Sequence, residues 1–225
     1  MSHELQAALQ ARYAVREEEF AHGGWSVRML LPRAADELID EREYAVDERL
    51  PYWAELWPSA RALARHLLDG GADDWAGVRV IELGAGVALP SLALLHLGAD
   101  TLATDWYADA LAFARTNAWR NGLGALRTDP LDWNHPPPEE RYPRLVAADV
   151  LYEKRNADLL AALLPRIVEP GGMALIADPG RVYAGEFLDA MRARGWAVDL
   201  ADERREKSAA QAESTVRIHR LRAPR

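Results

Sequence analysis

From Val78 to the end of the chain, short apolar runs alternate with longer segments in which apolar residues recur every three or four positions. The short runs are rich in Val, Ile, Leu and Ala, as buried strands are, whereas the longer segments have the period of helices. Strand–helix alternation with short links is typical of an α/β domain with a parallel, doubly wound sheet. This pattern therefore predicts the architecture of most of the chain.

The pattern also predicts where each element lies. We expect strands at residues 78–83, 99–105, 125–133, 144–149 and 171–178. Helices are expected at about residues 58–70, 90–97, 107–121, 156–168 and 185–194. The proline-rich segment 135–143 should be a loop. Two closing strands, joined by a charged loop, predict an antiparallel edge, with the strands at 196–200 and 214–221 and the loop at 202–213.

The first 55 residues precede this alternation. Apolar residues recur at helical spacing over residues 2–13, and the run 25–32 favours a strand. The charged run at 16–19 is expected to be a solvated face. We expect residues 1–55 to form an N-terminal extension that packs on a core domain made by residues 56–225.

Composition excludes several function classes. The chain has 27 Lys and Arg residues against 35 Asp and Glu residues, a formal net charge of −8. Since phosphate contacts depend on Lys and Arg, we expect no nucleic-acid partner. No apolar run approaches the roughly 20 residues of a membrane span, and the N-terminus has no signal-peptide core, so we expect no membrane partner and a cytoplasmic location. Without cysteine or histidines at ligand spacing, no metal is expected.

The strand expected at 78–83 runs into the sequence ELGAG, residues 82–86. Gly84 and Gly86 lead directly into a helix, and glycine lets a ligand approach the backbone and the free N–H groups of the helix N-terminus. Asp105 ends the next strand, about twenty residues after Gly84, and a carboxylate at this spacing suits the hydroxyls of a ribose. The pattern indicates a nucleotide-like ligand rather than a plain strand–helix turn.

Glu82 discriminates between two kinds of ligand. A carboxylate two residues before the glycine turn would repel the pyrophosphate of a dinucleotide but attract an ammonium or a sulfonium. The third glycine of the dinucleotide fingerprint is also missing, because Val87, Ala88 and Leu89 follow Gly86. These residues favour S-adenosyl-L-methionine over NAD as the cofactor.

The stretches ELGAG (82–86) and ATDW (103–106) resemble the class I, or seven-β-strand, methyltransferases that use S-adenosylmethionine. The resemblance implies a Rossmann-like, mostly parallel seven-stranded sheet whose last strand is antiparallel. It also implies that Glu82, Gly84 and Gly86 surround the methionine part of the cofactor and that Asp105 holds the ribose.

The same resemblance implies a site for the adenine. Trp106 would flank the ring, Asp132 would accept a hydrogen bond from the exocyclic amine, and Trp133 would lie beside the ring. An ordinary, partly buried aromatic is an equally good interpretation of Trp133. Trp57 could line the methionine side of the pocket, since aromatic faces bind cations.

Asp149 ends the strand at 144–149 and is followed by Tyr152 in the sequence DVLY. This sequence is similar to the Asp-x-x-Tyr signature of the seven-β-strand protein lysine methyltransferases. The segments PYWAELWPSARALARHLLD (51–69) and LIADPGR (175–181) resemble one branch, which methylates the β subunit of electron transfer flavoprotein. The resemblance implies a protein substrate that presents a lysine, with that β subunit as one candidate partner.

Methyl transfer needs a neutral amine, whereas a lysine in water has a pKa of about 10.4 and keeps its proton. A desolvated site and the charge of a sulfonium both lower that pKa. Asp149 should lie beside the cofactor, touch it, and accept a hydrogen bond from the incoming nitrogen. Tyr152 could orient the same nitrogen or line its channel. We expect Asp149 and Tyr152 to be the catalytic pair, acting mainly through positioning.

Other interpretations stay open. A methyltransferase of the same fold that acts on a small metabolite amine would also suit an aromatic cleft. A nucleotide-dependent oxidoreductase would need NAD, which Glu82 disfavours, and a non-catalytic cofactor-binding module would not need the Asp-x-x-Tyr pair. Locally, Asp149 could cap a helix, Tyr152 could simply pack, and the sequence DPGR (178–181) could be a turn or a loop that touches the substrate.

Overall fold

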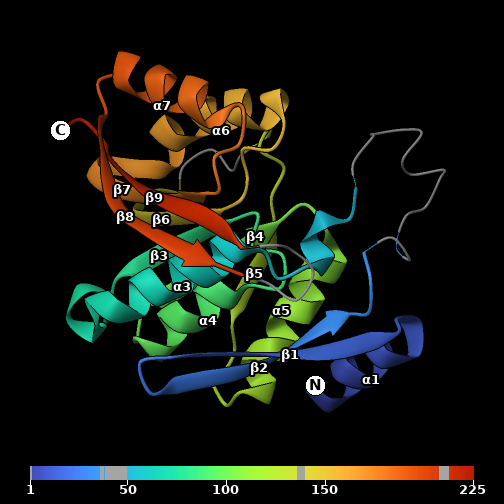
Figure 1. The fold of residues 1–225 in the computed structure, drawn as a ribbon. Helices are drawn as coiled ribbons and strands as arrows, with labels where there is room; N and C mark the ends of the chain where they lie inside the picture. Colours follow the sequence, from blue (N-terminus) through green and yellow to red (C-terminus); the bar gives the residue numbers. More distant parts are fainter. Residues whose placement is uncertain (1, 36–37, 39–49, 136–139, 208–212) are drawn as a thin grey trace.

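The computed structural model describes residues 2–35, 38, 50–135, 140–207 and 213–225. Its centre is a seven-stranded sheet in the order β5-β4-β3-β6-β7-β9-β8, which confirms the predicted doubly wound α/β architecture (Figure 1). The strands are β3 (Arg79–Leu83), β4 (Asp100–Asp105), β5 (Arg127–Pro130), β6 (Tyr142–Ala148), β7 (Val168–Asp178), β8 (Ala197–Glu206) and β9 (Ser214–Arg222). The flanking helices are α3 (Pro58–Gly70), α4 (Leu89–His96), α5 (Ala108–Arg120), α6 (Lys154–Ile167) and α7 (Ala184–Ala193).

The order of the strands locates the region where a ligand is expected. β3 pairs in parallel with β4 on one side and with β6 on the other, so the winding of the chain reverses between these neighbours. β5 and β7 extend the parallel sheet outward, and β9 is antiparallel to both β7 and β8, as predicted. In open α/β sheets, ligands bind beyond the carboxyl ends of the strands where the winding reverses.

The sheet is buried on both faces. Val80 and Val146 pack with α3 and α4, whereas their chain neighbours Ile81 and Leu145 pack with α6 and α7. Successive side chains of a strand point to opposite faces, so strands covered on both sides are apolar throughout. Figure 1 shows α6 and α7 on one face of the sheet and α3, α4 and α5 on the other.

The N-terminal segment forms α1 (Ser2–Arg12) and a hairpin of β1 (Val15–His22) and β2 (Trp25–Pro32), which lie beside α5 (Figure 1). The helix and β2 match their predicted positions. Asn117 of α5 accepts the N–H of Leu30 at 2.7 Å and donates to its carbonyl at 3.1 Å. The hairpin is therefore hydrogen-bonded to the helix as well as packed against it.

The sequence pattern does not predict β1, because residues 16–19 are charged throughout. In the structure, Glu18 accepts hydrogen bonds from Arg16 and from Arg61 of α3, each at 2.8 Å, and Glu17 pairs with Arg120 of α5. The expectation of a solvated face is wrong for Glu18. Arg61 of α3 and Arg120 of α5 compensate the charges of Glu18 and Glu17, so this strand needs no apolar pattern.

The sequence predicts a loop over 202–213, whereas β8 continues to Glu206. Charged residues of this part of β8 form ion pairs instead of packing in an apolar core; Glu203, for example, accepts from Arg217 of β9 at 2.9 Å. Strands are usually recognised by alternating apolar residues. The charged end of β8 lacks this alternation and has the composition of a loop, so the sequence pattern does not predict it. Residues 208–212 of the predicted loop lie outside the described residues.

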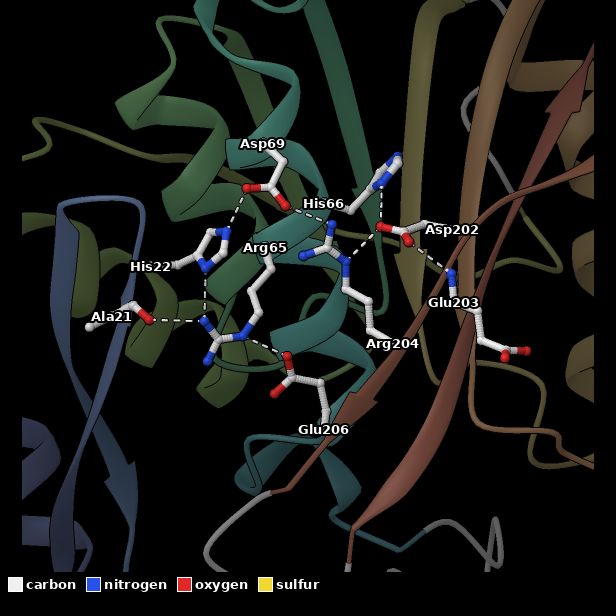
Figure 2. Close-up of polar contacts among 9 residues, drawn as sticks. All are labelled: Ala21, His22, Arg65, His66, Asp69, Asp202, Glu203, Arg204 and Glu206. Atoms are coloured by element: carbon white, nitrogen blue, oxygen red, sulfur yellow. Dashed lines mark hydrogen bonds and ion pairs between the residues drawn. The ribbon is translucent and has the colours of Figure 1, made fainter.

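A polar network connects β8 and the N-terminal hairpin to α3 (Figure 2). Arg204 of β8 donates to Asp202 and to Asp69 of α3, each at 2.6 Å. The second oxygen of Asp69 contacts His22 of β1 at 2.6 Å, and Arg65 donates to the other ring nitrogen of His22 at 3.0 Å. Three segments that are distant in sequence are thus joined by charged hydrogen bonds.

Three other boundaries differ from the prediction. β5 stops at Pro130 instead of extending to residue 133, because Asp132 accepts the N–H of Asn134 and forms a turn. β6 begins at Tyr142, inside the predicted loop, of which residues 136–139 lie outside the described residues. β7 begins at Val168, directly after α6. No helix in the described part of the chain is long and apolar enough to cross a membrane.

Candidate functional site

A cleft of about 1050 Å³, part of it open to solvent, lies at the carboxyl ends of β3, β4 and β6. This is the region where the strand order predicts a ligand. All ten residues that the sequence singles out line the cleft: Trp57, Glu82, Gly84, Gly86, Asp105, Trp106, Asp132, Trp133, Asp149 and Tyr152.

The turn after β3 needs glycine at two positions. Gly84 and Gly86 have positive φ angles of 62° and 52°. A Cβ atom at residue 84 would lie 3.0 Å from Cγ1 of Val150, and one at residue 86 would lie 3.1 Å from the backbone oxygen of Trp53. Both conformation and space therefore require glycine, and the turn brings the N-terminus of α4 to the cleft.

Glu82 is buried and caps α4 from the preceding strand. Its Oε2 accepts the backbone N–H of Ser91 at 2.9 Å and the Ser91 hydroxyl as well. Ala88 at the N-cap has no side-chain acceptor, so Glu82 supplies the missing cap. Burial raises the pKa of Glu82 to about 8; the Ser91 hydrogen bonds oppose the shift, and the charge of Asp105 adds to it. A cation bound in the cleft would favour the ionised form.

Asp105 ends β4 and is buried at the edge of the cleft. Its Oδ2 accepts the N–H of Gly86 at 2.8 Å, and its Oδ1 accepts the N–H of Tyr107 at 2.9 Å. These bonds connect β4 to the glycine turn and fix the plane of the carboxylate. The acid is therefore oriented before any ligand arrives, as a ribose-binding carboxylate must be.

The three predicted adenine residues, Trp106, Asp132 and Trp133, all line the cleft. Trp106 is 45% exposed, and Trp133 is half-buried. Asp132 accepts the backbone N–H and the side-chain amide of Asn134, each at 2.9 Å, and contacts His135 at 2.8 Å. The hydrogen bond with His135 holds the pKa of Asp132 at about 2, against a smaller opposing effect of burial. A bond from Asp132 to an adenine amine would therefore compete with the Asn134 side chain.

Asp149 follows β6 with a φ of 58°, a left-handed conformation that is unusual for a residue with a side chain. Its N–H donates to the carbonyl of Ala177 in β7 at 2.9 Å, which holds the turn in place. Arg181 Nε donates to Oδ1 of Asp149 at 2.7 Å, and the Ser59 hydroxyl lies 3.4 Å from Oδ2. The buried carboxylate is thus paired with a cation, as buried charges usually are.

Tyr152 lies at the rim of the cleft and is 37% exposed. Its ring makes an edge contact with Tyr52, with the centroids 5.1 Å apart, and Tyr52 contacts Trp57 in the same way at 5.8 Å. α6 begins only after both members of the Asp-x-x-Tyr pair, and its N-cap is Glu153. The alternative in which Asp149 caps this helix is therefore wrong.

Arg181 is the principal residue that the sequence interpretation missed. Asp178 Oδ1 accepts the N–H groups of Gly180 and Arg181 at 2.7 and 2.8 Å, so DPGR is a tight turn. From this turn the Arg181 guanidinium reaches Asp149 and lies 5.6 Å from the centre of the Trp57 ring. Asp149 follows β6 and the DPGR turn follows β7, and these two strands are parallel neighbours in the sheet. Their neighbouring carboxyl ends were the available signal for the ion pair.

The cleft has a distinct chemical character. Its described lining contains carboxylates, aromatic rings and the backbone of a helix N-terminus, and none of these lining residues is Lys, Arg or His. Such a site fits a ligand with an aromatic base, ribose hydroxyls and a positive charge, and it disfavours a polyphosphate. Among the described residues, no group of three or more His, Asp or Glu side chains could hold a metal ion.

Comparison with known proteins gives a family match and two informative relatives. A family model described as lysine methyltransferase matches residues 49–193. The electron transfer flavoprotein beta subunit lysine methyltransferase of Xenopus laevis is 35% identical over 135 residues, which cover 58% of this chain and 53% of that protein. Protein N-lysine methyltransferase METTL21A of Danio rerio is 30% identical over 155 residues, 65% of this chain and 70% of that protein. The chain spans about half the length of the flavoprotein-directed relatives it matches.

Solved structures share the architecture. A putative RNA methyltransferase from Pyrococcus horikoshii matches with a TM-score of 0.60 and 17% identity, over 77% of this chain and 89% of that one. At this identity the likeness shows the fold alone. It agrees with a Rossmann-like sheet in which β9 runs antiparallel to both of its neighbours, β7 and β8, near one edge.

Proposed function

The chain belongs to the lysine methyltransferase family, and from that premise we propose that it is an S-adenosylmethionine-dependent enzyme that N-methylates a lysine side chain of a protein. The observation that carries the proposal is that Asp149 and Tyr152 line the same cleft as the glycine turn of residues 84–86. A methyl donor on the glycine turn and an amine at Asp149 would therefore meet inside one pocket.

The residues around the glycine turn suit the methionine and ribose parts of the cofactor. S-adenosylmethionine supplies an electrophilic methyl group when it is bound. We assign the ammonium of the cofactor to the buried carboxylate of Glu82. The methionine part would approach the backbone closely at Gly84 and Gly86, which line the cleft in a turn that leaves little room for a Cβ atom. Asp105, already oriented by two backbone N–H groups, would accept the ribose hydroxyls.

The remaining cofactor assignments concern the adenine and the sulfonium. We assign Trp106 and Trp133 to the faces or edges of the adenine. Asp132 would accept a hydrogen bond from the exocyclic amine, which would replace the hydrogen bond that the Asn134 side chain donates to Asp132. We assign Trp57 to the methionine side of the pocket, because its ring, which already lies 5.6 Å from the Arg181 guanidinium, is suited to a cation. Each of these residues lines the cleft.

The acceptor amine would be held by the Asp-x-x-Tyr pair. Asp149 accepts a hydrogen bond from the amine nitrogen and aims its lone pair at the methyl carbon, while the partly exposed Tyr152 lines the path by which the amine enters. The aromatic residues Tyr52 and Trp57 exclude water from this path. Most of the rate enhancement then comes from orientation and desolvation of the amine.

The substrate that we propose is a protein lysine. A long alkyl stem with a terminal cation suits an entrance made of aromatic rings, because the stem packs on them while the charge proceeds to Asp149. The β subunit of electron transfer flavoprotein is the first candidate, since relatives named for that substrate match the chain. We also propose a cytoplasmic location, because a chain without cysteine suits a reducing compartment.

The experiment that tests the proposal is transfer of labelled methyl groups from S-adenosylmethionine into a lysate of the source cell, and into the purified flavoprotein β subunit of the same source. Asp149→Asn should lower transfer at least about 100-fold and leave cofactor affinity nearly unchanged, because the lost contact is made to the amine. Asp158→Asn, which removes an exposed carboxylate of α6 that pairs with Lys154, is the matched control.

Three outcomes separate the interpretations. A discrete labelled protein that disappears with Asp149→Asn supports the proposal and supplies the substrate for identification of the modified lysine. Label confined to small molecules would replace the protein substrate with a metabolite amine. Equal transfer by the parent protein and Asp149→Asn would contradict the catalytic assignment of Asp149.

A further inference from the structure

The two oxygens of the Asp149 carboxylate have different surroundings. Oδ1 accepts a short hydrogen bond from Arg181 Nε at 2.7 Å, whereas Oδ2 is 3.4 Å from the Ser59 hydroxyl, a weak contact. The side chain of Asp149 is 4% exposed and that of Arg181 is 34% exposed. One oxygen is therefore committed to an ion pair, and Oδ2 is the better acceptor for a substrate.

Arg181 supports Asp149 from outside the cleft. Asp149 is among the residues that line the cleft and Arg181 is not. The guanidinium lies 5.6 Å from the centre of the Trp57 ring, and the backbone N–H of Arg181 donates to Asp178, a buried acid, at 2.8 Å. Both ends of the arginine are thus held, so it can pair with Asp149 without occupying the space of an incoming amine.

The charged groups around Asp149 determine how Arg181 would affect the protonation of a bound amine. The ionisable side chains that line the described cleft are all acids: the phenols of three tyrosines and the carboxyls of Glu55, Glu82, Asp105 and Asp132 beside Asp149. The carboxylates that are ionised stabilise an ammonium, the form of lysine that has no lone pair for a methyl group. Behind Asp149, the acid Asp178 and the cation Arg181 face it from the turn after β7.

We propose that Arg181 is a positioning residue that balances the charge of Asp149, so that Oδ2 of the carboxylate holds the acceptor amine in its neutral, nucleophilic form. The inference rests on the proposed methyltransferase function. The entering ammonium gives one proton to water. The nitrogen lone pair then forms the bond to the methyl carbon as the carbon–sulfur bond breaks, which leaves a methylammonium and a neutral thioether.

A binding experiment tests this role without a protein substrate. Sinefungin is a cofactor analogue with a primary ammonium in the place of the transferable methyl group, whereas S-adenosylhomocysteine carries nothing there. The ratio of their dissociation constants reports how well the surroundings of Asp149 accept an ammonium. Arg181→Gln should increase the preference for sinefungin at least about fivefold at pH 7.5, because a nearby positive charge is lost.

Two variants separate charge from packing. Arg181→Lys keeps the cation and should retain the parental ratio, whereas Arg181→Met keeps packing on Trp57, loses the cation and should behave like Arg181→Gln. Arg192→Gln, which removes an exposed cation of α7, is the control for net charge. An unchanged or reduced preference for sinefungin in Arg181→Gln and Arg181→Met overturns the inference. Failure of the parent protein to bind either ligand would instead contradict the proposed cofactor.

The pH dependence of methyl transfer supplies the second readout. In Arg181→Gln the bound amine keeps its proton to higher pH, so the midpoint of the kcat profile, which reports groups in the enzyme–substrate complex, should move upward by about one pH unit. Arg181→Lys should leave the midpoint in place. Faster transfer by Arg181→Gln at pH 7 would show that the arginine obstructs the amine, and this result would also overturn the inference.

Discussion

Ser91 donates both its backbone N–H and its hydroxyl to one oxygen of Glu82, so a single buried carboxylate caps α4 and lines the cleft. Burial raises the pKa of this carboxyl to about 8, which leaves it mostly protonated at neutral pH without a bound cation. If the ammonium of S-adenosylmethionine pairs with Glu82, the cofactor must bind the ionised form. Binding and proton release are then linked.

We expect cofactor affinity to fall as the pH falls. Below pH 8, each binding event must remove a proton from Glu82, so the Kd should rise about tenfold for each pH unit in the limit of full protonation. Titration calorimetry of S-adenosylhomocysteine between pH 6 and 7.5, in two buffers of different ionisation enthalpy, measures both the Kd and the released proton.

Glu82→Gln is the control for that measurement, because its amide oxygen can still accept from Ser91 while the side chain cannot ionise. This variant should bind more weakly at pH 7.5 and show no dependence on pH in the same range. A parental Kd that is constant from pH 6 to 7.5, without proton release, would contradict the assignment of Glu82 to the ammonium.

Asp105→Asn should weaken cofactor binding by about 1–3 kcal/mol, since the ribose hydroxyls lose a charged acceptor. Asp129→Asn on the neighbouring strand β5 is the control, because that side chain is exposed. Calorimetry with S-adenosylhomocysteine and with its 2′-deoxyribose analogue makes the test specific. The parent should discriminate between the two ligands and Asp105→Asn should not; equal discrimination by both proteins would refute the ribose assignment.

Much of the fold is predictable because its signal is periodic and local. The strand and helix pattern after Val78 gives the doubly wound sheet, and Pro58 with Gly70 gives α3 its bounds. The pattern fails where charge replaces apolar packing. Glu18 of β1 and Arg204 of β8 lie in strands, but ion pairs with α3 compensate for the missing apolar residues, and such pairing depends on a fold that the local sequence does not display.

The candidate site shows the same division. Gly84, Gly86 and Asp105 are recognisable because one turn and one strand end fix their spacing, and the structure brings them together in one cleft. The partners of two acids are not recognisable. Ser91 meets Glu82, and Arg181 meets Asp149, only after a helix start or a neighbouring strand brings them close. The sequence predicts which acids face the cleft, but not what else binds them.

Arg204→Gln should destabilise the protein by about 1 kcal/mol, because Asp69 and Asp202 both lose a charged donor. Burial would raise the pKa of each carboxyl, but its hydrogen bonds hold the pKa below the usual 3.8. A lowered folded pKa contributes stability that is present above the unfolded pKa and is lost as the pH falls through the folded value. The difference between parent and variant should therefore be largest near pH 7 and shrink below about pH 4.

Urea unfolding at several pH values measures that difference. Arg217→Gln is the matched control, since Arg217 pairs with Glu203 on the exposed side of β8 and β9 and should contribute little. Equal losses for the two variants, or a loss that is constant down to pH 3, would contradict a stabilising role for the network between β8 and α3.

Gly86→Ala and Gly124→Ala form a matched pair for the glycine turn. Both residues have positive φ, 52° and 82°, so alanine should cost roughly 1–2 kcal/mol of backbone strain at either position. A Cβ at residue 124 meets nothing within 4 Å, whereas one at residue 86 would lie 3.1 Å from the backbone oxygen of Trp53. The difference between the variants therefore isolates the close approach at the turn.

We expect Gly86→Ala to weaken S-adenosylhomocysteine binding at least about tenfold, because relief of the contact with Trp53 shifts the N–H that Gly86 donates to Asp105. Gly124→Ala should bind as the parent does while losing similar stability from strain. Calorimetry and thermal unfolding of both variants decide the matter. If the two alanines lower stability equally and neither alters ligand affinity, the space at residue 86 has no part in binding and the turn serves the fold alone.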